Sequence, residues 1–171
     1  MDSAERVEKA VALFKQGYNC AQSVTAAFAD LYGLTPEQTL LISASFGAGI
    51  GRMREVCGAA SGMFILAGLQ CGSAISGDAE GKKLNYEVVQ MLATKFRERN
   101  GSMICGELLG LRPMQNPIVN STSLTDSEAT SLVSTDPVPE ARTEDYYKKR
   151  PCVKMVEEGA RIFAEYLDGL K

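Results

Sequence analysis

The sequence predicts an all-α protein, a single-domain helical bundle of about six to seven helices with a long irregular loop before the last helix. Three observations predict this fold. Apolar residues recur at helical spacing in successive segments, capping residues stand at the starts of these segments, and glycines or polar turns separate them. The chain has 171 residues, of which 45% are hydrophobic and 23% are charged. This size and composition are typical of one folded domain, here residues 1–171, that needs no disulfide or metal to fold.

Three helix starts are predicted near the N-terminus. Asp2 and the glutamate three residues later have the spacing of a capping box, and Gly17 ends the helix that they begin. Asn19 caps a second helix, which ends at Gly33. The run Thr-Pro-Glu-Gln at 35–38 begins a third helix, because it combines an N-cap, a proline at the first helical position and a capping-box glutamine.

A glycine-rich loop separates these helices from the next one. The loop, residues 46–52, has glycine at alternate positions and cannot continue a stable helix. A helix of small residues follows at about 57–74. Its glycines, alanines and serine are expected to let neighbouring backbones approach closely.

The C-terminal half contains three further helices and the irregular loop. Apolar spacing predicts a helix over 82–99, and Ser102 is expected to cap a short helix that ends at Leu109. The stretch 112–143 is rich in serine, threonine, proline and aspartate and has no sustained period, so we expect a polar surface loop. A last helix spans about 151–167.

Composition excludes several classes of function. The chain has no histidine, which rules out Ser-His-Asp and Cys-His nucleophiles and imidazole metal ligands. Its 18 basic and 21 acidic residues are interspersed and give a formal net charge of -3, so no nucleic acid is expected as a partner. No apolar segment is long enough for a membrane span, and the N-terminus lacks a signal-peptide pattern. We therefore expect a cytoplasmic protein.

Four of the five cysteines stand at or near the start of a predicted helix. Asn19 and Ser102 are the predicted N-caps before two of them, and the glycine loop and a proline precede the other two. A helix N-terminus carries unpaired N–H groups and a partial positive charge, which favour the thiolate over the thiol. The thiolate is the form that attacks disulfides and binds soft metals. The candidate reactive cysteines are Cys20, Cys57, Cys105 and Cys152.

The spacing of these cysteines leaves their joint role open. They form no CxxC pair, which argues against a zinc knuckle or ribbon. Four helix starts can still meet at one end of a bundle, where they would form either exchangeable disulfides or a four-thiolate site. The simpler alternative is that they are core residues, because free cysteine is among the most buried residue types. Cys71, late in an apolar helix, is interpreted in this way.

The glycine loop is predicted to position Cys57. Its sequence lacks the spacing of nucleotide-binding loops and follows a helix, so we interpret it as a close-packed turn. Arg52 and Arg54 precede Cys57 and favour a thiolate there, and Arg52 is also a candidate for holding an anion. The glycines assigned to this part of the site are Gly47, Gly49, Gly51, Gly58 and Gly62.

Motifs around the four cysteines follow one another in a recognisable order. They are Gly-Tyr-Asn-Cys-Ala at 17–21, Phe-Gly-Ala-Gly-Ile-Gly-Arg-Met at 46–53, Cys-Gly-Ala-Ala-Ser-Gly at 57–62, Asn-Gly-Ser at 100–102 before Cys105, and the late Cys152. Together they resemble the C_GCAxxG_C_C family of redox-active proteins. The resemblance implies a helical domain with a redox role, in which the four characteristic cysteines are those named above.

Three functions fit these observations. The first is a thiol-based oxidoreductase, in which Cys57 attacks a disulfide and another cysteine resolves it. This function needs no cofactor, and its partners are a redox protein or a small thiol or disulfide. The second is an all-sulfur site for zinc or an iron–sulfur cluster, with Cys20, Cys57, Cys105 and Cys152 as ligands. The third is a non-enzymatic helical module that binds a partner, for instance through the loop 112–143. A homodimer is compatible with all three.

Overall fold

The structure confirms the all-α fold. It is a computed structural model that describes residues 1–114 and 136–171, so most of the predicted loop 112–143 lies outside the described residues. Eight α-helices and two short 3₁₀ helices occur in the described part, which contains one isolated β-bridge, between Val56 and Ile104, and no strand. The elements are α1 (Ser3–Lys15), α2 (Cys20–Ala26), η1 (Ala29–Tyr32), α3 (Pro36–Ser43), η2 (Ala44–Phe46), α4 (Gly58–Cys71), α5 (Ala79–Asn100), α6 (Cys105–Leu108), α7 (Glu144–Lys149) and α8 (Cys152–Asp168).

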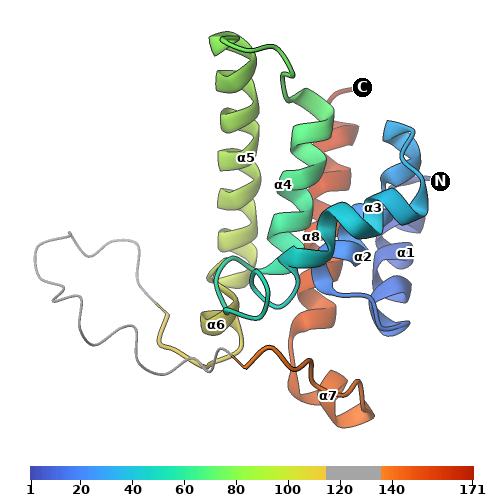
Figure 1. Cartoon of the computed structure of the whole chain (residues 1–171), viewed down its shortest axis with the longest axis vertical. Helices are drawn as coiled ribbons and strands as arrows, with labels where there is room; N and C mark the ends of the chain where they lie inside the picture. Colours follow the sequence, from blue (N-terminus) through green and yellow to red (C-terminus); the bar gives the residue numbers. More distant parts are fainter. Residues whose placement is uncertain (115–135) are drawn as a thin grey trace, which may run out of the picture.

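Helices α4 and α8 form the centre of the bundle. They pack against each other, and both also contact α2 and α5, while α1 packs on α8 and α2. Figure 1 shows α4, α5 and α8 side by side, with the loop before α4, the short α6 and the start of α8 gathered at the lower end of the bundle. No helix in the described residues is long and apolar enough to cross a membrane.

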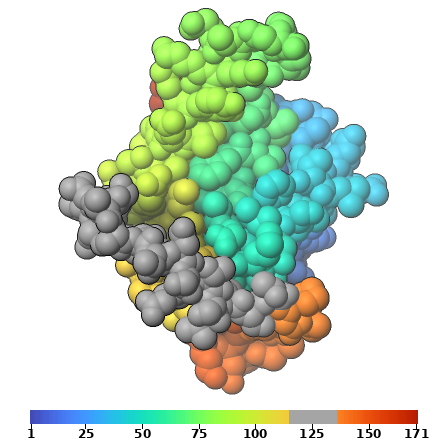
Figure 2. All heavy atoms as spheres, turned by 60° about the vertical axis from the view of Figure 1, so that its left-hand side comes forward, coloured from blue at the N-terminus to red at the C-terminus, as the bar shows by residue number. Residues whose placement is uncertain are grey.

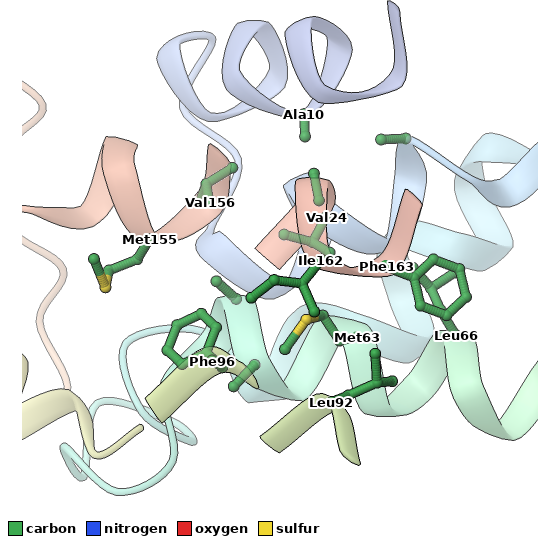
Figure 3. Packing of buried hydrophobic residues seen from close by; sticks show 14 of the residues in the cluster. Ala10, Val24, Met63, Leu66, Leu92, Phe96, Met155, Val156, Ile162 and Phe163 are labelled. Carbon is green, nitrogen blue, oxygen red and sulfur yellow. The ribbon is translucent and has the colours of Figure 1, made fainter. Parts of the chain in front are cut away.

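The core lies between these helices and is built from large apolar side chains. Each fully buried residue of this kind stabilises the fold by about 1.5–3 kcal/mol relative to exposure. Phe28 and Phe163 meet edge to face, with ring centroids 5.1 Å apart. The labelled residues in Figure 3 come from five helices: Ala10, Val24, Met63, Leu66, Leu92, Phe96, Met155, Val156, Ile162 and Phe163.

The small residues of α4 let its neighbours approach closely, as predicted. A Cβ added at Gly62 would lie 2.9 Å from the Cβ of Val24, and one added at Gly159 of α8 would lie 3.1 Å from the carbonyl oxygen of Ala59. Such distances leave no room for a side chain at either glycine. Close packing of α4 is what brings the N-termini of α2, α4 and α8 to the same end of the bundle.

The second predicted helix is shorter than expected. The capping boxes at Asp2 and Thr35 form as predicted, and the predicted N-cap Asn19 forms one as well. Helix α2 nevertheless ends at Ala26, and a 3₁₀ helix continues the chain to Gly33. A buried arginine accounts for the break. The guanidinium group of Arg6 donates a hydrogen bond to the carbonyl of Ala27 at 2.9 Å and pairs with Asp30. This carbonyl therefore does not accept the backbone hydrogen bond that a continuing α-helix would require.

Other helix boundaries also differ from the prediction. Helix α5 begins at Ala79, three residues early, because the Asp78 side chain caps it. Helix α4 ends at Cys71, where Gly72 adopts an extended conformation. Helix α7 was not predicted, because its sequence Glu-Asp-Tyr-Tyr-Lys-Lys has too few apolar residues to show a helical period.

The prediction that Ser102 caps the short helix was wrong. Helix α6 begins at Cys105, and its N-cap residue Ile104 makes no side-chain capping bond. Ser102 instead accepts a hydrogen bond from the backbone N–H of Ile104 at 2.9 Å and donates one to the buried carboxylate of Glu107. Its hydroxyl therefore stabilises the turn before α6 and is not the N-cap of this helix.

Candidate functional site

Four cysteines line one cavity at the end of the bundle where the loop, α6 and the start of α8 meet. The cavity has a volume of about 430 Å³. Figure 2 shows the lower end of the molecule, where the parts near residues 50, 110 and 145 are coloured teal, yellow and orange. The wall contains the cysteines that the sequence singled out, Cys20, Cys57, Cys105 and Cys152.

Each of these cysteines stands at the start of a helix, as predicted. Cys20 and Cys152 are the first residues of α2 and α8, Cys57 is the N-cap residue of α4, and Cys105 is the first residue of the four-residue α6. Cys71 lies at the opposite end of α4 and is not part of the cavity wall. All five cysteines are free thiols in the structure.

The glycine loop is a left-handed turn. Residues 48–52 all have positive φ, and the non-glycine residues Ala48, Ile50, Arg52 and Arg54 lie between +54° and +69°. For a residue with a side chain this conformation costs about 1–2 kcal/mol. Backbone hydrogen bonds close the turn, including one from the N–H of Gly51 to the carbonyl of Ser45 at 2.7 Å. The alternate glycines predicted a tight turn, but they gave no sign that the residues between them would be left-handed too.

The glycines of the loop and of α4 allow the cysteine-bearing segments to touch. A Cβ at Gly49 would lie 2.6 Å from the Cβ of Cys105, and one at Gly58 would lie 3.0 Å from the Cβ of Cys20. A Cβ at Gly47 would overlap the side chain of Asn19. The loop therefore does more than position the cysteine that follows it, because it also packs directly against α6 and the start of α2.

Backbone hydrogen bonds tie the loop to α6. The N–H of Cys57 donates to the carbonyl of Met103 at 2.7 Å, and the N–H of Cys105 donates to the carbonyl of Glu55 at 2.6 Å. These two bonds flank the isolated bridge between Val56 and Ile104. They fix Cys57 and Cys105 next to each other on the wall.

Asn19 positions Cys20. Its side chain accepts a hydrogen bond from the N–H of Gln22 at 3.0 Å and donates one to the carbonyl of Ala44 at 2.8 Å. The first bond caps α2, and the second joins the start of α2 to η2, which leads into the glycine loop.

Among the described residues, the cavity wall carries four arginines and one carboxylate. Arg52 and Arg54, which the sequence singled out, are joined by Arg142 and Arg150, and the carboxylate belongs to Glu140. Sequence reasoning missed the last three because they come from the polar stretch before α8 and show no periodic pattern. The only available signal was that Arg150 lies two residues before Cys152.

Cys152 has the most acidic thiol of the four. A hydrogen bond from the thiol of Cys20 lowers its pKa most, and although burial opposes this effect, attraction to Arg150 and Arg142 brings the pKa down to about 7. Tyr146 on α7 makes a smaller contribution that also lowers the pKa of Cys152. Cys152 is also partly exposed, whereas the other three cysteines are buried.

Cys20 is the partner that keeps its proton. Its hydrogen bond to Cys152 and its burial raise the pKa of Cys20 well above the usual value. The two pKa values thus shift in opposite directions, which favours a thiolate at Cys152 and a thiol at Cys20.

The pKa order differs from the one that the sequence suggested. Burial raises the pKa of Cys57 to about 12, and the N–H groups of Ala59 and Ala60 offset only part of this rise. Burial also raises the pKa of Cys105, despite the charge of Arg54 and a hydrogen bond from it. Arg54 thus acts on Cys105 more than on Cys57, and the buried surroundings of Cys57 outweigh the help expected from its helix start.

The four-thiolate alternative has no geometric support in the part of the chain that the structure describes. There, no three or more cysteine, aspartate or glutamate side chains are arranged to hold a metal ion. Zinc and an iron–sulfur cluster therefore remain sequence-based predictions.

The fold and the cavity define a class: an all-α bundle with four cysteines at helix starts around one pocket. The chain belongs to the C_GCAxxG_C_C family, because the model of that family, described as "Putative redox-active protein (C_GCAxxG_C_C)", matches residues 18–166. The match includes all four cavity cysteines and the glycine loop. No curated protein and no solved structure matches the chain. The family description supports a redox role for the cysteines and names no substrate.

Proposed function

We propose that this protein is a thiol–disulfide oxidoreductase in which Cys152 is the attacking thiolate and Cys20 resolves the mixed disulfide. One observation carries the proposal: Cys20 and Cys152, the first residues of α2 and α8, lie on the wall of the same cavity. The partial exposure and the lowered pKa of Cys152 support its role as the nucleophile.

The reaction takes two exchange steps. The thiolate sulfur of Cys152 attacks one sulfur of a substrate disulfide, so that a mixed disulfide forms and the other substrate sulfur leaves as a thiolate. Cys20 then gives its proton to the departed thiolate, and its sulfur attacks the sulfur of Cys152 and releases the second substrate thiolate. The substrate gains two electrons, and the Cys20–Cys152 pair becomes a disulfide. A dithiol, either small or on a redox protein, returns the pair to the reduced form.

The effect of Cys152 on the pKa of Cys20 supports a reaction in which Cys152 attacks first and Cys20 second. The largest cause of the raised pKa of Cys20 is its hydrogen bond to Cys152. Once the sulfur of Cys152 is part of a mixed disulfide, its negative charge is gone, and so is that contribution to the pKa of Cys20. Cys20 therefore becomes easier to ionise at the step in which it must attack.

Two variants of Cys20 test the pairing. Cys20→Ala removes the hydrogen-bond donor, so the Cys152 thiolate loses stabilisation and its pKa rises from about 7. Cys20→Ser keeps a hydroxyl donor at the same place. We expect the pH midpoint of Cys152 alkylation to rise by roughly one unit or more in the alanine variant and by less in the serine variant. Mass spectrometry of the peptide that contains Cys152 measures the midpoints, and equal midpoints near pH 9 in all three proteins would contradict the proposal.

A further inference from the structure

Three arginines on the cavity wall converge on one carboxylate. Nitrogens of Arg52 and Arg54 lie 3.2 and 3.6 Å from an oxygen of Glu140, and Arg150 donates hydrogen bonds to both oxygens of the same carboxylate. Arg52 also lies 3.6 Å from the carboxylate of Asp136, so two negative charges face these three positive charges. Arg142 adds a fourth guanidinium group to the wall, and its Nη1 atom is buried without a hydrogen-bond partner in the described residues.

The arginines are more buried than the carboxylate that they face. The Arg54 side chain is 7% exposed and its charge lowers the pKa of Cys105, and the Arg52 side chain is 18% exposed. The Glu140 side chain is 39% exposed and belongs to residues 136–140, which form no helix and are all exposed. Glu140 can therefore move away without disturbing a helix, while the buried Arg54 stays on the cavity wall.

The backbone of the glycine loop also suggests a site built for an anion. Arg52 and Arg54 have φ values of +69° and +64°, which an arginine adopts only at an energetic cost. This conformation directs both side chains to the cavity wall. Residues held in such unfavourable conformations cluster at functional sites.

We propose that Arg52, Arg54 and Arg150 bind a carboxylate of the substrate, and that Glu140 occupies its place until the substrate arrives. The substrate class is then a small disulfide that carries carboxylate groups. Arginine binds planar carboxylates through paired hydrogen bonds, and a cavity of about 430 Å³ has the size of a small-molecule site. The inference rests on the proposed function, since that function supplies the reacting sulfur, Cys152.

A pair of disulfide probes tests the inference. Dithiobis(nitrobenzoate) carries carboxylates and dithiodipyridine is neutral, and each releases a product that is followed by its visible or ultraviolet absorbance when a protein thiolate attacks it. The measured quantity is the ratio of their second-order rate constants, anionic to neutral. A change in thiol reactivity moves both rate constants, whereas a change in carboxylate binding moves the ratio.

Two substitutions should move this ratio in opposite directions. Arg52→Gln removes one cation, and we expect the ratio to fall by roughly tenfold, the effect of losing one charged hydrogen bond. Arg52 suits the test because the strongest influences on the Cys152 thiol come from Cys20, Arg150 and Arg142. Glu140→Gln removes a competing carboxylate, so the ratio should rise severalfold.

Arg161→Gln is the matched control. Arg161 is an exposed arginine that pairs with Glu157 on α8, and its replacement should leave the ratio unchanged.

Each outcome has a separate meaning. Ratios within twofold of each other in wild type, Arg52→Gln and Glu140→Gln would overturn the carboxylate site while leaving the thiol function standing. If neither probe reacts at Cys152 in the wild type, the proposed function itself is overturned. Because Glu140 is exposed, Glu140→Gln should fold. This variant therefore tests the carboxylate site even if Arg52→Gln does not fold.

Discussion

Replacing Cys152 with serine should remove the fast-reacting thiol of the folded protein. At pH 7 a thiol with a pKa of about 7 is half ionised, whereas a buried thiol with a pKa of about 12 is almost entirely protonated. A thiolate of lower pKa is intrinsically less nucleophilic, but this reduction is much smaller than the gain in the ionised fraction. We therefore expect the wild type to take up one iodoacetamide group in a fast phase, and the cavity cysteines of Cys152→Ser to react roughly tenfold or more slowly.

Cys71→Ser is the matched control for this experiment. Cys71 lies at the far end of α4, outside the cavity wall, and its sulfur donates a hydrogen bond to the carbonyl of Ala67. The fast phase should survive in this variant, and peptide mapping should locate the label at Cys152. A fast phase that persists in Cys152→Ser and maps to Cys57 would restore the order that the sequence suggested.

Gly49→Ala should destabilise the protein far more than Gly51→Ala, although both glycines lie in the same left-handed turn. Both have positive φ, so an alanine at either position costs about 1–2 kcal/mol. An added Cβ at Gly51 meets no atom within 4 Å, but at Gly49 it would lie 2.6 Å from the Cβ of Cys105 and 2.7 Å from the backbone nitrogen of Glu55. We expect the free energy of unfolding to fall by about 3 kcal/mol or more in Gly49→Ala.

Urea denaturation of the two variants measures the difference. With an unchanged m-value, the midpoint should shift about twice as far in Gly49→Ala as in Gly51→Ala. Gly49→Ala should also alter alkylation of Cys105, because relief of the clash separates the loop from α6. Equal midpoints in the two variants would mean that the loop does not pack on α6 as described.

Local signals made most of the fold predictable. The N-caps Asp2, Asn19 and Thr35 each act within one turn of chain, so they can be recognised in sequence and were found in place. The break after α2 was not predictable in this way. The break depends on Arg6, which lies 21 residues before Ala27 in the chain. Arg6 becomes buried only when α1 packs on α2.

The location of the cavity cysteines was predictable, but their relative reactivity was not. Helix starts identified Cys20, Cys57, Cys105 and Cys152, and the bundle brings them to one wall. Reactivity depends on burial and on charges from other segments, which spacing does not reveal. Arg54 lies three residues from Cys57 in the chain, yet its charge lowers the pKa of Cys105.

The cavity combines two properties that a small-molecule thiol reaction needs. A partly exposed thiol with a lowered pKa, Cys152, shares the wall with Cys20, and an arginine cluster lies on the same wall. In the proposed reaction, the arginines hold the substrate while the two sulfurs exchange bonds. Cys57 and Cys105 share this wall, but burial keeps both as thiols near neutral pH.

The pairing of Cys20 with Cys152 can be measured directly by mapping the disulfide that mild oxidation produces. The reduced protein is treated with a stoichiometric amount of diamide, the remaining thiols are alkylated, and the digest is examined by mass spectrometry without reduction. The account predicts a single major cross-link between the peptides that contain Cys20 and Cys152, with Cys57 and Cys105 recovered as free thiols. A cross-link between Cys57 and Cys105, or no intramolecular disulfide at all, would contradict it.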